Sequence, residues 1–248
     1  MPSIKNTNVL VIGGSSGIGL GVAEKCLAED ATVHIASSNP ARINEAIASL
    51  QAKYPSSKPT GHVCDLNSEE VEKNLQALLE AVQPLDHIVF TAGDRLNILP
   101  LENISLDSIR QAGHVRFVVP LLLAKLAPKY MTRGSGSKAS ITLTSGSSSE
   151  KPIPGWSLFN GYCTGLQGTT RSLAVDLKPL RVNLVIPGAV RTPLLEGLGA
   201  EVLDAMAQQT ALGKIGSAEE VAEAYVYLMK DSNATGSCVS TNAGGPLI

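Results

Sequence analysis

The segment Asn8-Val-Leu-Val-Ile12 is followed directly by Gly13-Gly-Ser-Ser-Gly17-Ile-Gly19. An apolar run, a glycine-rich turn and a helical pattern opening at Ile18 predict a strand, a phosphate-binding loop and a helix, in that order. Gly13 allows a tight turn out of the strand, while Gly17 and Gly19 allow backbone to approach a pyrophosphate closely. The phosphates would lie at the helix N-terminus, where unpaired N–H groups favour anions. We therefore expect a dinucleotide site that includes Gly13, Ser15, Ser16, Gly17, Ile18 and Gly19; the alternative is a purely structural turn.

The size and composition of the chain indicate one globular domain. Its 248 residues suffice for a single α/β domain with a large core, and an apolar content of 44% excludes general disorder. A net charge of −2 gives no indication of a nucleic acid or of an anionic membrane surface as partner. The longest apolar run, 117–124, is too short to span a bilayer, and the first residues do not resemble a secretory signal. The four cysteines are scattered without metal-binding spacing, so we expect reduced thiols, no metal site and a cytoplasmic protein.

Apolar runs alternate with helical patterns along the whole chain. We expect strands at 8–12, 31–36, 61–64, 85–91, 139–144, 181–186 and 237–240. Helices are expected at 17–29, at 40–52 and after Asn67 or Ser68. After the strand at 85–91, a long helical region is expected up to about Met131, with interruptions near Gly113 and Pro120. Further helices are expected at 155–177 and twice within 194–230. This alternation predicts an α/β fold: one doubly wound, Rossmann-type domain with a parallel sheet and helices on both faces. Ligands of such sheets bind beyond the carboxyl ends of the strands.

The end of the second strand bears on the choice of dinucleotide. An acidic residue there would bind the ribose 2′-hydroxyl of NAD, but the chain has Ser37, Ser38 and, a little later, Arg42. Hydroxyl groups and an arginine would tolerate or pair with a 2′-phosphate. This favours NADP(H); alternatively, Arg42 is a solvated residue in the first turn of the next helix.

A series of motifs in order resembles the short-chain dehydrogenase/reductase family over nearly the full length. The motifs are Gly13–Gly19, Asp65-Leu66, Ala92-Gly93, Ser145, Gln167–Leu177, Arg181-Val-Asn183, Pro187-Gly188 with Thr192, and Asn242-Ala-Gly-Gly245. The resemblance implies seven parallel strands, with Asp65 and Leu66 near the adenine and Ala92-Gly93 along the adenosine ribose. It places Pro187, Gly188, Val190 and Thr192 among the cofactor-binding residues toward the nicotinamide. It also implies a homodimer or homotetramer formed through the helices near 105–130 and 157–177.

The catalytic residues depart from the family pattern. The family uses a Ser, a Tyr, a Lys four residues after the Tyr, and a supporting Asn. Counting from Gln167-Gly168 and Arg171, the Tyr and Lys positions fall on Phe159 and Cys163, and the Asn position falls on His114. Only the serine remains, as Ser145. In the family the tyrosine protonates the carbonyl oxygen as hydride arrives, and Phe159 cannot do this.

Several chemistries are compatible with this loss. Tyr162, three residues beyond Phe159, could act as the acid from a shifted position, or it could be a subunit contact. His114 could act as a general acid, or it could be a packed helix residue. An iminium carbon accepts hydride without a proton, and the absence of a lysine charge would favour such a cation, with Glu150 helping to hold it. Hydride transfer could instead be lost, leaving a cyclase or a nucleotide-binding protein, or an ordinary ketoreductase could use another acid.

The segment Thr144-Ser-Gly-Ser-Ser-Ser-Glu-Lys-Pro-Ile-Pro-Gly-Trp156 also resembles a divergent subgroup of the family that includes fungal indole-alkaloid reductases. Some members of that subgroup reduce an iminium with NADPH and guide a Diels–Alder cyclisation. The resemblance makes Arg116 and Glu150 candidates for organising the substrate, alongside Ser145. Residues 194–212 would cover a small apolar substrate, and Trp156 would either wall the pocket or pack. We therefore expect an NADP(H)-dependent oxidoreductase acting on a secondary-metabolite intermediate.

Overall fold

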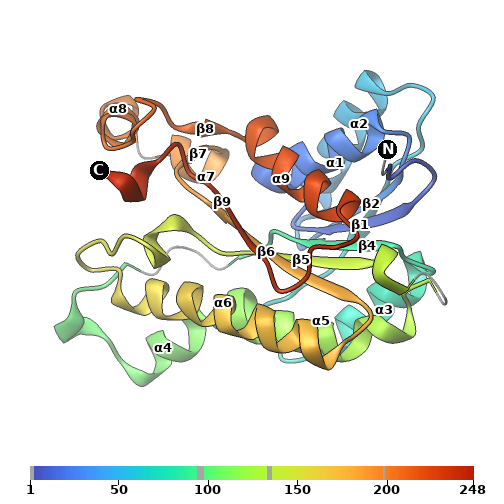
Figure 1. The fold of residues 1–248 in the computed structure, drawn as a ribbon, viewed down its shortest axis with the longest axis horizontal. Helices are drawn as coiled ribbons and strands as arrows, with labels where there is room; N and C mark the ends of the chain where they lie inside the picture. Colours follow the sequence, from blue (N-terminus) through green and yellow to red (C-terminus); the bar gives the residue numbers. More distant parts are fainter. Residues whose placement is uncertain (1–2, 94–97, 133–135, 198) are drawn as a thin grey trace.

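The computed structural model describes residues 3–93, 98–132, 136–197 and 199–248 and shows a twisted parallel sheet between two layers of helices (Figure 1). Seven strands pair in the order β3-β2-β1-β4-β5-β6-β9, and every pairing is parallel. They are β1 Asn8–Ile12, β2 Thr32–Ser37, β3 Thr60–Val63, β4 His87–Phe90, β5 Ser140–Thr144, β6 Arg181–Pro187 and β9 Cys238–Thr241. The prediction of a doubly wound, seven-stranded Rossmann-type domain is confirmed.

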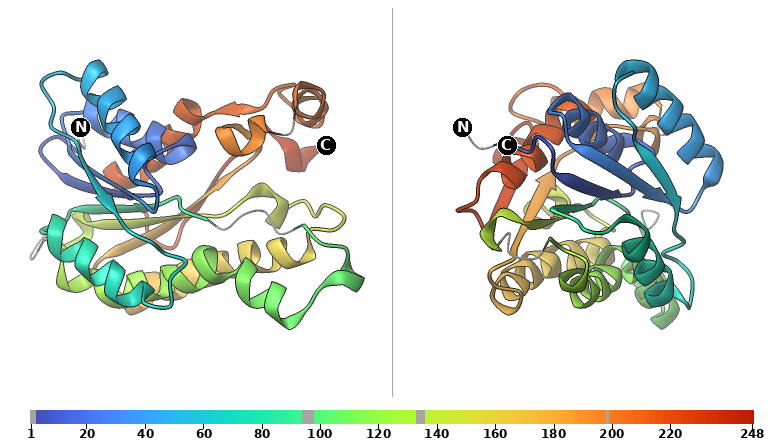
Figure 2. Two further views of the ribbon diagram at one scale, coloured as in Figure 1. Left: turned by 180° about the vertical axis from the view of Figure 1, so that it is seen from behind. Right: turned by 90° about the vertical axis from the view of Figure 1, so that its right-hand side faces the viewer.

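Helices cover both faces of the sheet, as the two further views show (Figure 2). One face carries α1 Gly17–Ala28, α2 Pro40–Lys53 and α9 Ala218–Lys230; the other carries α3 Val71–Val82, α5 Val119–Leu126 and α6 Ser157–Asp176. The strands are apolar on both faces because each face is covered, and β1, β4 and β6 are almost wholly buried. Two buried apolar clusters, one on each face, therefore fix how the helices lie against the sheet.

The helical region before β5 differs in detail from the sequence prediction. It consists of α4 Leu106–Ala112, a π-helical turn at His114–Val118, and α5. The interruption near Gly113 is confirmed. Pro120 does not interrupt α5, because it lies in the first turn of this helix, where its missing N–H is tolerated. A π-helical turn inside a helical stretch is frequent at functional sites, and this one contains both His114 and Arg116.

The region after β6 contains one helix more than the two predicted. Short α7, Pro193–Glu196, precedes α8, Ala200–Gln208, and then α9 follows. A separate two-stranded pair, β7 Val190–Arg191 with β8 Gly216–Ser217, closes this segment back on itself. The pair was not predicted, because a two-residue strand is too short to give a periodic pattern.

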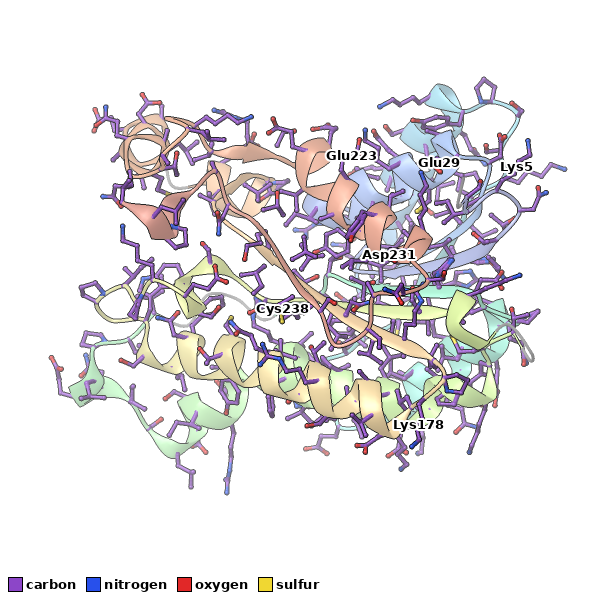
Figure 3. The ribbon with its side chains drawn as sticks, viewed as in Figure 1. Lys5, Glu29, Lys178, Glu223, Asp231 and Cys238 are labelled. Carbon is purple, nitrogen blue, oxygen red and sulfur yellow. The ribbon has the colours of Figure 1, made fainter. Side chains whose placement is uncertain are left out.

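A buried arginine fixes the far end of the sheet. Arg181 is 2% exposed, and its guanidinium donates to the carbonyls of Leu228 and Met229 in the last turn of α9, at 2.7 and 2.9 Å. The ion pairs Lys25–Glu223 and Lys230–Glu29 join α1 to α9 at the surface; Figure 3 labels Glu29 and Glu223. The Arg181-Val-Asn183 motif thus has a structural role, away from the carboxyl ends of the strands.

In the described part of the chain, no helix has the length and apolar character needed to cross a membrane, and no three His, Cys, Asp or Glu side chains group as metal ligands.

Candidate active site

The loop after β1 has the geometry of a phosphate cradle. Gly13 has a φ of +91°, and a Cβ there would lie 2.6 Å from the Ala92 nitrogen. A Cβ on Gly19 would lie 2.3 Å from the Gly13 carbonyl oxygen, so glycine is required for α1 to begin this close to the turn. Ser16 precedes α1 without capping it through its side chain, and the first turn has no acidic residue. The N-terminus of α1 therefore remains positive and suited to a pyrophosphate.

The end of β2 lies beside this loop, since Gly13 and Gly14 both donate to the Ala36 carbonyl. Ser37 accepts a hydrogen bond from the Asn39 N–H, and Asn39 caps α2 by accepting from the Arg42 N–H at 3.1 Å. The Arg42 side chain is exposed in the first turn of α2. The strand end thus offers hydroxyl groups from Ser37 and Ser38 and one cation, with no carboxylate in the segment 37–42.

The remaining expected cofactor residues follow β3 and β4 at the carboxyl edge of the sheet, with β2 and β1 between these two strands. Asp65 and Leu66 follow β3; Asp65 accepts from the Asn67 N–H at 2.9 Å, and Leu66 is buried. Ala92 and Gly93 follow β4, where Ala92 donates to the Ile12 carbonyl at 3.1 Å. Because β1 and β4 are adjacent and their following segments meet at Gly13, these residues border the switch point of the sheet.

The loop after β6 reaches back to the phosphate loop. A Cβ on Gly17 would lie 3.1 Å from Thr192 Cγ2, so Thr192 lies directly against the start of α1. Gly188 packs on Asn242, since a Cβ on Gly188 would lie 2.8 Å from Asn242 Cα. Val190 is buried. The segment from Pro187 to Thr192 thus lies against the glycine loop, and the glycines and backbone N–H groups gathered here fit a dinucleotide.

Arg116 and Phe159 stack at the centre of the site. The Arg116 Cζ lies 4.8 Å from the centroid of the Phe159 ring, and the edge of that ring meets Trp156 with centroids 5.3 Å apart. Gly93 makes room for the guanidinium, since a Cβ there would lie 2.3 Å from Arg116 Nη2. Arg116 thus joins the segment after β4 to α6, and the only tryptophan packs on the aromatic residue that replaces the family's tyrosine.

Ser145 and Cys163 lie beneath this stack, both buried. Ser145 Oγ donates to the Cys163 carbonyl at 2.9 Å, and the Ser145 N–H donates to the Val185 carbonyl. Burial raises the pKa of the Cys163 thiol, although the nearby positive charge of Arg116 and a hydrogen bond with Ser145 act in the opposite direction. The thiol is therefore neutral, and the cation near this position belongs to Arg116. Arg116, named from the sequence as a candidate for organising the substrate, thus supplies the positive charge that Cys163 lacks.

Tyr162 does not join this group. Its hydroxyl donates to the Ile109 carbonyl on α4 at 2.7 Å, its ring packs on Gly113, and its centroid lies 5.6 Å from that of Phe117. The hydroxyl is thus used in a contact between α4 and α6, and the structure does not support Tyr162 as a displaced acid. His114 lies at the start of the π-helical turn, with Nε2 buried and without a hydrogen-bond partner among the described residues.

Glu150 follows the 3₁₀ turn at Ser147–Ser149, in the loop after β5. Its carboxylate accepts from Ser240 Oγ at 3.0 Å and from Asn242 Nδ2 at 3.4 Å, so it ties the loop after β5 to the end of β9. The end of the expected covering segment 194–212, after α8, lies beside the C-terminal residues, because the Leu212 N–H donates to the Ala243 carbonyl. Leu198 lies outside the described residues. The end of the segment 194–212 and residues 240–248 thus lie side by side.

The sequence did not identify one polar group near Phe159, Ser148. Its side chain is 7% exposed, and its Oγ has no hydrogen-bond partner among the described residues. Within the Ser-Ser-Ser run 147–149 the sequence offers no signal that separates this serine from its neighbours. The distinction comes from the short 3₁₀ turn at Ser147–Ser149, in which the Ser149 hydroxyl has two hydrogen-bond partners while the buried Ser148 hydroxyl has none among the described residues.

Comparison with known proteins gives a consistent result. A family model described as an SDR-like Rossmann domain matches residues 2–248. The short-chain dehydrogenase/reductase malC of Malbranchea aurantiaca is 44% identical over 253 residues, which cover 97% of this chain and 95% of the relative. The short-chain dehydrogenase/reductase ATR9 of Stachybotrys chlorohalonatus is 40% identical, with 98% of each chain covered.

Solved structures agree with the sequence comparison. The structure of MalC Reductase/Diels-Alderase from Malbranchea aurantiaca matches with a TM-score of 0.93 at 43% identity, covering 99% of this chain and 98% of that chain. A small-chain dehydrogenase in complex with NADPH matches with a TM-score of 0.80 at 28% identity, covering 98% and 100%. Together with the glycine loop and the parallel sheet, these matches show that the chain belongs to the short-chain dehydrogenase/reductase family, whose Rossmann domain binds a nicotinamide cofactor.

Proposed function

We propose that the protein is an NADPH-dependent reductase that transfers hydride to a carbon already activated as an electrophile, such as an iminium carbon in a secondary-metabolite intermediate. The observation that carries this proposal is the identity of the side chains around Phe159. The ring contacts a guanidinium and a tryptophan, and serine hydroxyls lie close by. None of these groups releases a proton near neutral pH, since arginine remains protonated above pH 12.

The chain's own residues would divide the work as follows. The glycine loop and the N-terminus of α1 hold the pyrophosphate, and the Pro187–Thr192 segment borders the nicotinamide end. A bound reduced nicotinamide supplies the hydride. Arg116 would take the electrostatic place of the missing lysine and would donate to a ribose hydroxyl of the cofactor. An iminium that receives hydride becomes a neutral amine, so no proton is needed at that moment.

The preference for the phosphorylated cofactor rests on the end of β2. Ser37, Ser38 and Arg42 provide hydroxyls and a cation where an NAD-selective site has a carboxylate. Replacing Arg42 with Ala should weaken NADPH binding about tenfold, the loss expected for one charge-assisted hydrogen bond, and leave NADH binding unchanged. Equal weakening of both cofactors would remove this preference.

Coupling to a cyclisation is supported by the 43% identity to a protein described as a reductase/Diels-Alderase. The apolar residues that the sequence has in the segment 194–212 suit a bulky, apolar substrate. Single-turnover NADPH oxidation should be tested with N-methyl-3,4-dihydroisoquinolinium, a cyclic iminium, and with α-tetralone, a ketone of similar shape. The proposal expects reduction of the iminium alone, and selective reduction of the ketone would overturn it. Binding of NADPH without reduction of any electrophile would favour the alternative, a cofactor-scaffolded cyclase.

We also propose that the chain forms a homodimer or homotetramer through α4, α5 and α6. These helices carry exposed Leu106, Ile109, Val118, Leu121 and Val175, and an apolar groove of about 540 Å³ runs between α4 and α6. Exposed apolar side chains on helices of this kind are typical of subunit contacts. Replacing Leu121 with Glu should shift the mass measured by light scattering toward the monomer, whereas a monomeric wild-type protein would contradict the proposal.

A further inference from the structure

Two serines near Phe159 differ in what their hydroxyl groups can do. Ser145 donates its proton to the Cys163 carbonyl at 2.9 Å, a bond held in place by the backbone of α6. Toward a ligand it therefore presents lone pairs and acts as an acceptor. The hydroxyl of Ser148 is 93% buried by residue exposure and has no partner among the described residues, so its proton is available.

Ser148 and the Phe159 ring lie beside the same residue, Gly146. A Cβ built on Gly146 would lie 3.8 Å from Phe159 Cζ and 4.0 Å from Ser148 Oγ. Cζ is the ring atom that carries the hydroxyl in a tyrosine. The Ser148 hydroxyl and the tip of the Phe159 ring, from which a tyrosine hydroxyl would project, therefore both lie beside Gly146.

The turn that carries Ser148 is held firmly. Ser149 Oγ donates to the Gly146 carbonyl at 2.7 Å and accepts from Gln167 Nε2 at 3.1 Å. Glu150 is bonded to Ser240, as described above. A buried hydroxyl without a partner destabilises a folded protein, and native proteins keep few of them. A rigid turn that holds such a group beside the reaction centre points to a ligand that satisfies it.

We propose that Ser148 is a substrate-binding residue, donating a hydrogen bond to a carbonyl oxygen that the substrate carries close to the reacting carbon. This inference rests on the proposed function and narrows its substrate class to activated electrophiles with a neighbouring amide or carbonyl acceptor. Because a serine hydroxyl is far too weak an acid to give up its proton near neutral pH, Ser148 binds and orients this oxygen without protonating it. The oxygen is not reduced, so the hydride and the hydrogen bond go to different atoms.

Binding of two probes to the protein with NADP⁺ present tests this directly, because no hydride transfer is needed. The probes are N-methyl-3,4-dihydroisoquinolinium and its 3-carboxamide, which share the electrophilic carbon but differ in the acceptor. Trp156, the only tryptophan, packs on Phe159 and reports binding through its fluorescence. We expect the carboxamide to bind about five- to tenfold more tightly to the wild type, and Ser148→Ala to abolish this difference. The neighbouring Ser147→Ala should retain it.

A second measurement needs no ligand at all. Since the Ser148 hydroxyl is unsatisfied without substrate, Ser148→Ala should leave the Tm of the free protein unchanged or raise it. Ser149→Ala removes two hydrogen bonds in the same turn and should lower Tm by about 2–4 °C. If Ser148→Ala lowers Tm as much as Ser149→Ala does, then Ser148 has a structural partner and the inference is overturned.

The outcomes separate the inference from the proposed function. Preference for the carboxamide that depends on Ser148, without NADPH oxidation, would support the inference and contradict the reductase. Reduction of both probes without any preference would support the reductase and contradict the inference. If neither probe binds, the substrate class named here is wrong, whatever the Tm of Ser148→Ala.

Discussion

The contact between Gly93 and Arg116 allows a test of the proposed role of Arg116 through a residue that carries no functional group. Alanine at position 93 would place Cβ 2.3 Å from Arg116 Nη2 and 2.7 Å from Cζ. Ordinary carbon contacts lie at about 3.5–4.0 Å, so the guanidinium must move by more than about 1 Å. The end of a flexible side chain can move in this way, so we expect the fold to tolerate the substitution while the stack on Phe159 is lost.

The size of the effect follows from the interactions that are lost. Separating the guanidinium from the ring removes about 1 kcal/mol and should lower Tm by about 2–4 °C for a chain of this length. A charge-assisted hydrogen bond to the ribose contributes about 1.5–3 kcal/mol, so NADPH should bind about 10–150-fold more weakly. NADH should be affected to the same degree, because the ribose hydroxyls on the nicotinamide side are common to both cofactors.

A double-mutant cycle separates this effect from a direct one, since Gly93 itself belongs to the expected cofactor residues. Dissociation constants for NADPH are measured by fluorescence for Gly93→Ala, Arg116→Ala and the double variant. If Gly93→Ala acts by displacing Arg116, it should have little further effect once Arg116 is replaced. Fully additive losses would refute the reasoning and would mean that the methyl group obstructs the cofactor itself.

Three further outcomes are expected from contacts of single side chains. Tyr162→Phe loses the bond to the Ile109 carbonyl and should lower stability by about 1 kcal/mol, measured by urea unfolding, with hydride transfer unchanged; a large loss of rate would restore Tyr162 as the acid. Burial lowers the pKa of His87 to about 4 from 6.5, so the unfolded chain binds more protons between these values and stability falls as pH is lowered through this range. At about 1.36 kcal/mol per pH unit the loss approaches roughly 3 kcal/mol, and it should be absent in His87→Gln; an unchanged pH dependence in that variant would contradict this origin. Cys163→Lys would bury an ammonium near the Arg116 guanidinium, so it should destabilise the protein strongly, as thermal unfolding would show, unless Arg116→Gln is added; a stable single variant would contradict the placement of that charge.

The fold was predictable because its signals are local and repeated. The glycine loop after Ile12, the apolar strands and the alternation with helical patterns each follow from short-range physics, and together they determine the topology. The positions of Phe159 and Cys163 followed from the spacing of the family motifs. What failed were elements without periodicity, such as the pair β7–β8, and the number of helices between 194 and 230.

The details of the site were less predictable because they depend on side-chain direction. Tyr162 is three residues from Phe159 in sequence, yet its hydroxyl lies against α4. Arg116 could be read as a solvated charge, and only the fold brings it over the Phe159 ring and against Gly93. The serine run 147–149 likewise contains one buried hydroxyl without a partner among the described residues, which no composition rule distinguishes.

The central claim is that hydride reaches a carbon which needs no proton from the protein during transfer. Single-turnover reduction of N-methyl-3,4-dihydroisoquinolinium by NADPH carrying deuterium at C4, followed between pH 6 and 9 in H₂O and in D₂O, tests it most directly. The account expects deuterium on the reacting carbon, a slower reaction with the labelled cofactor, and a rate independent of both pH and solvent isotope. A rate that falls with rising pH, as a proton donor such as His114 would lose its proton, together with slower reaction in D₂O, would contradict it. A proton donor would then take part in the transfer.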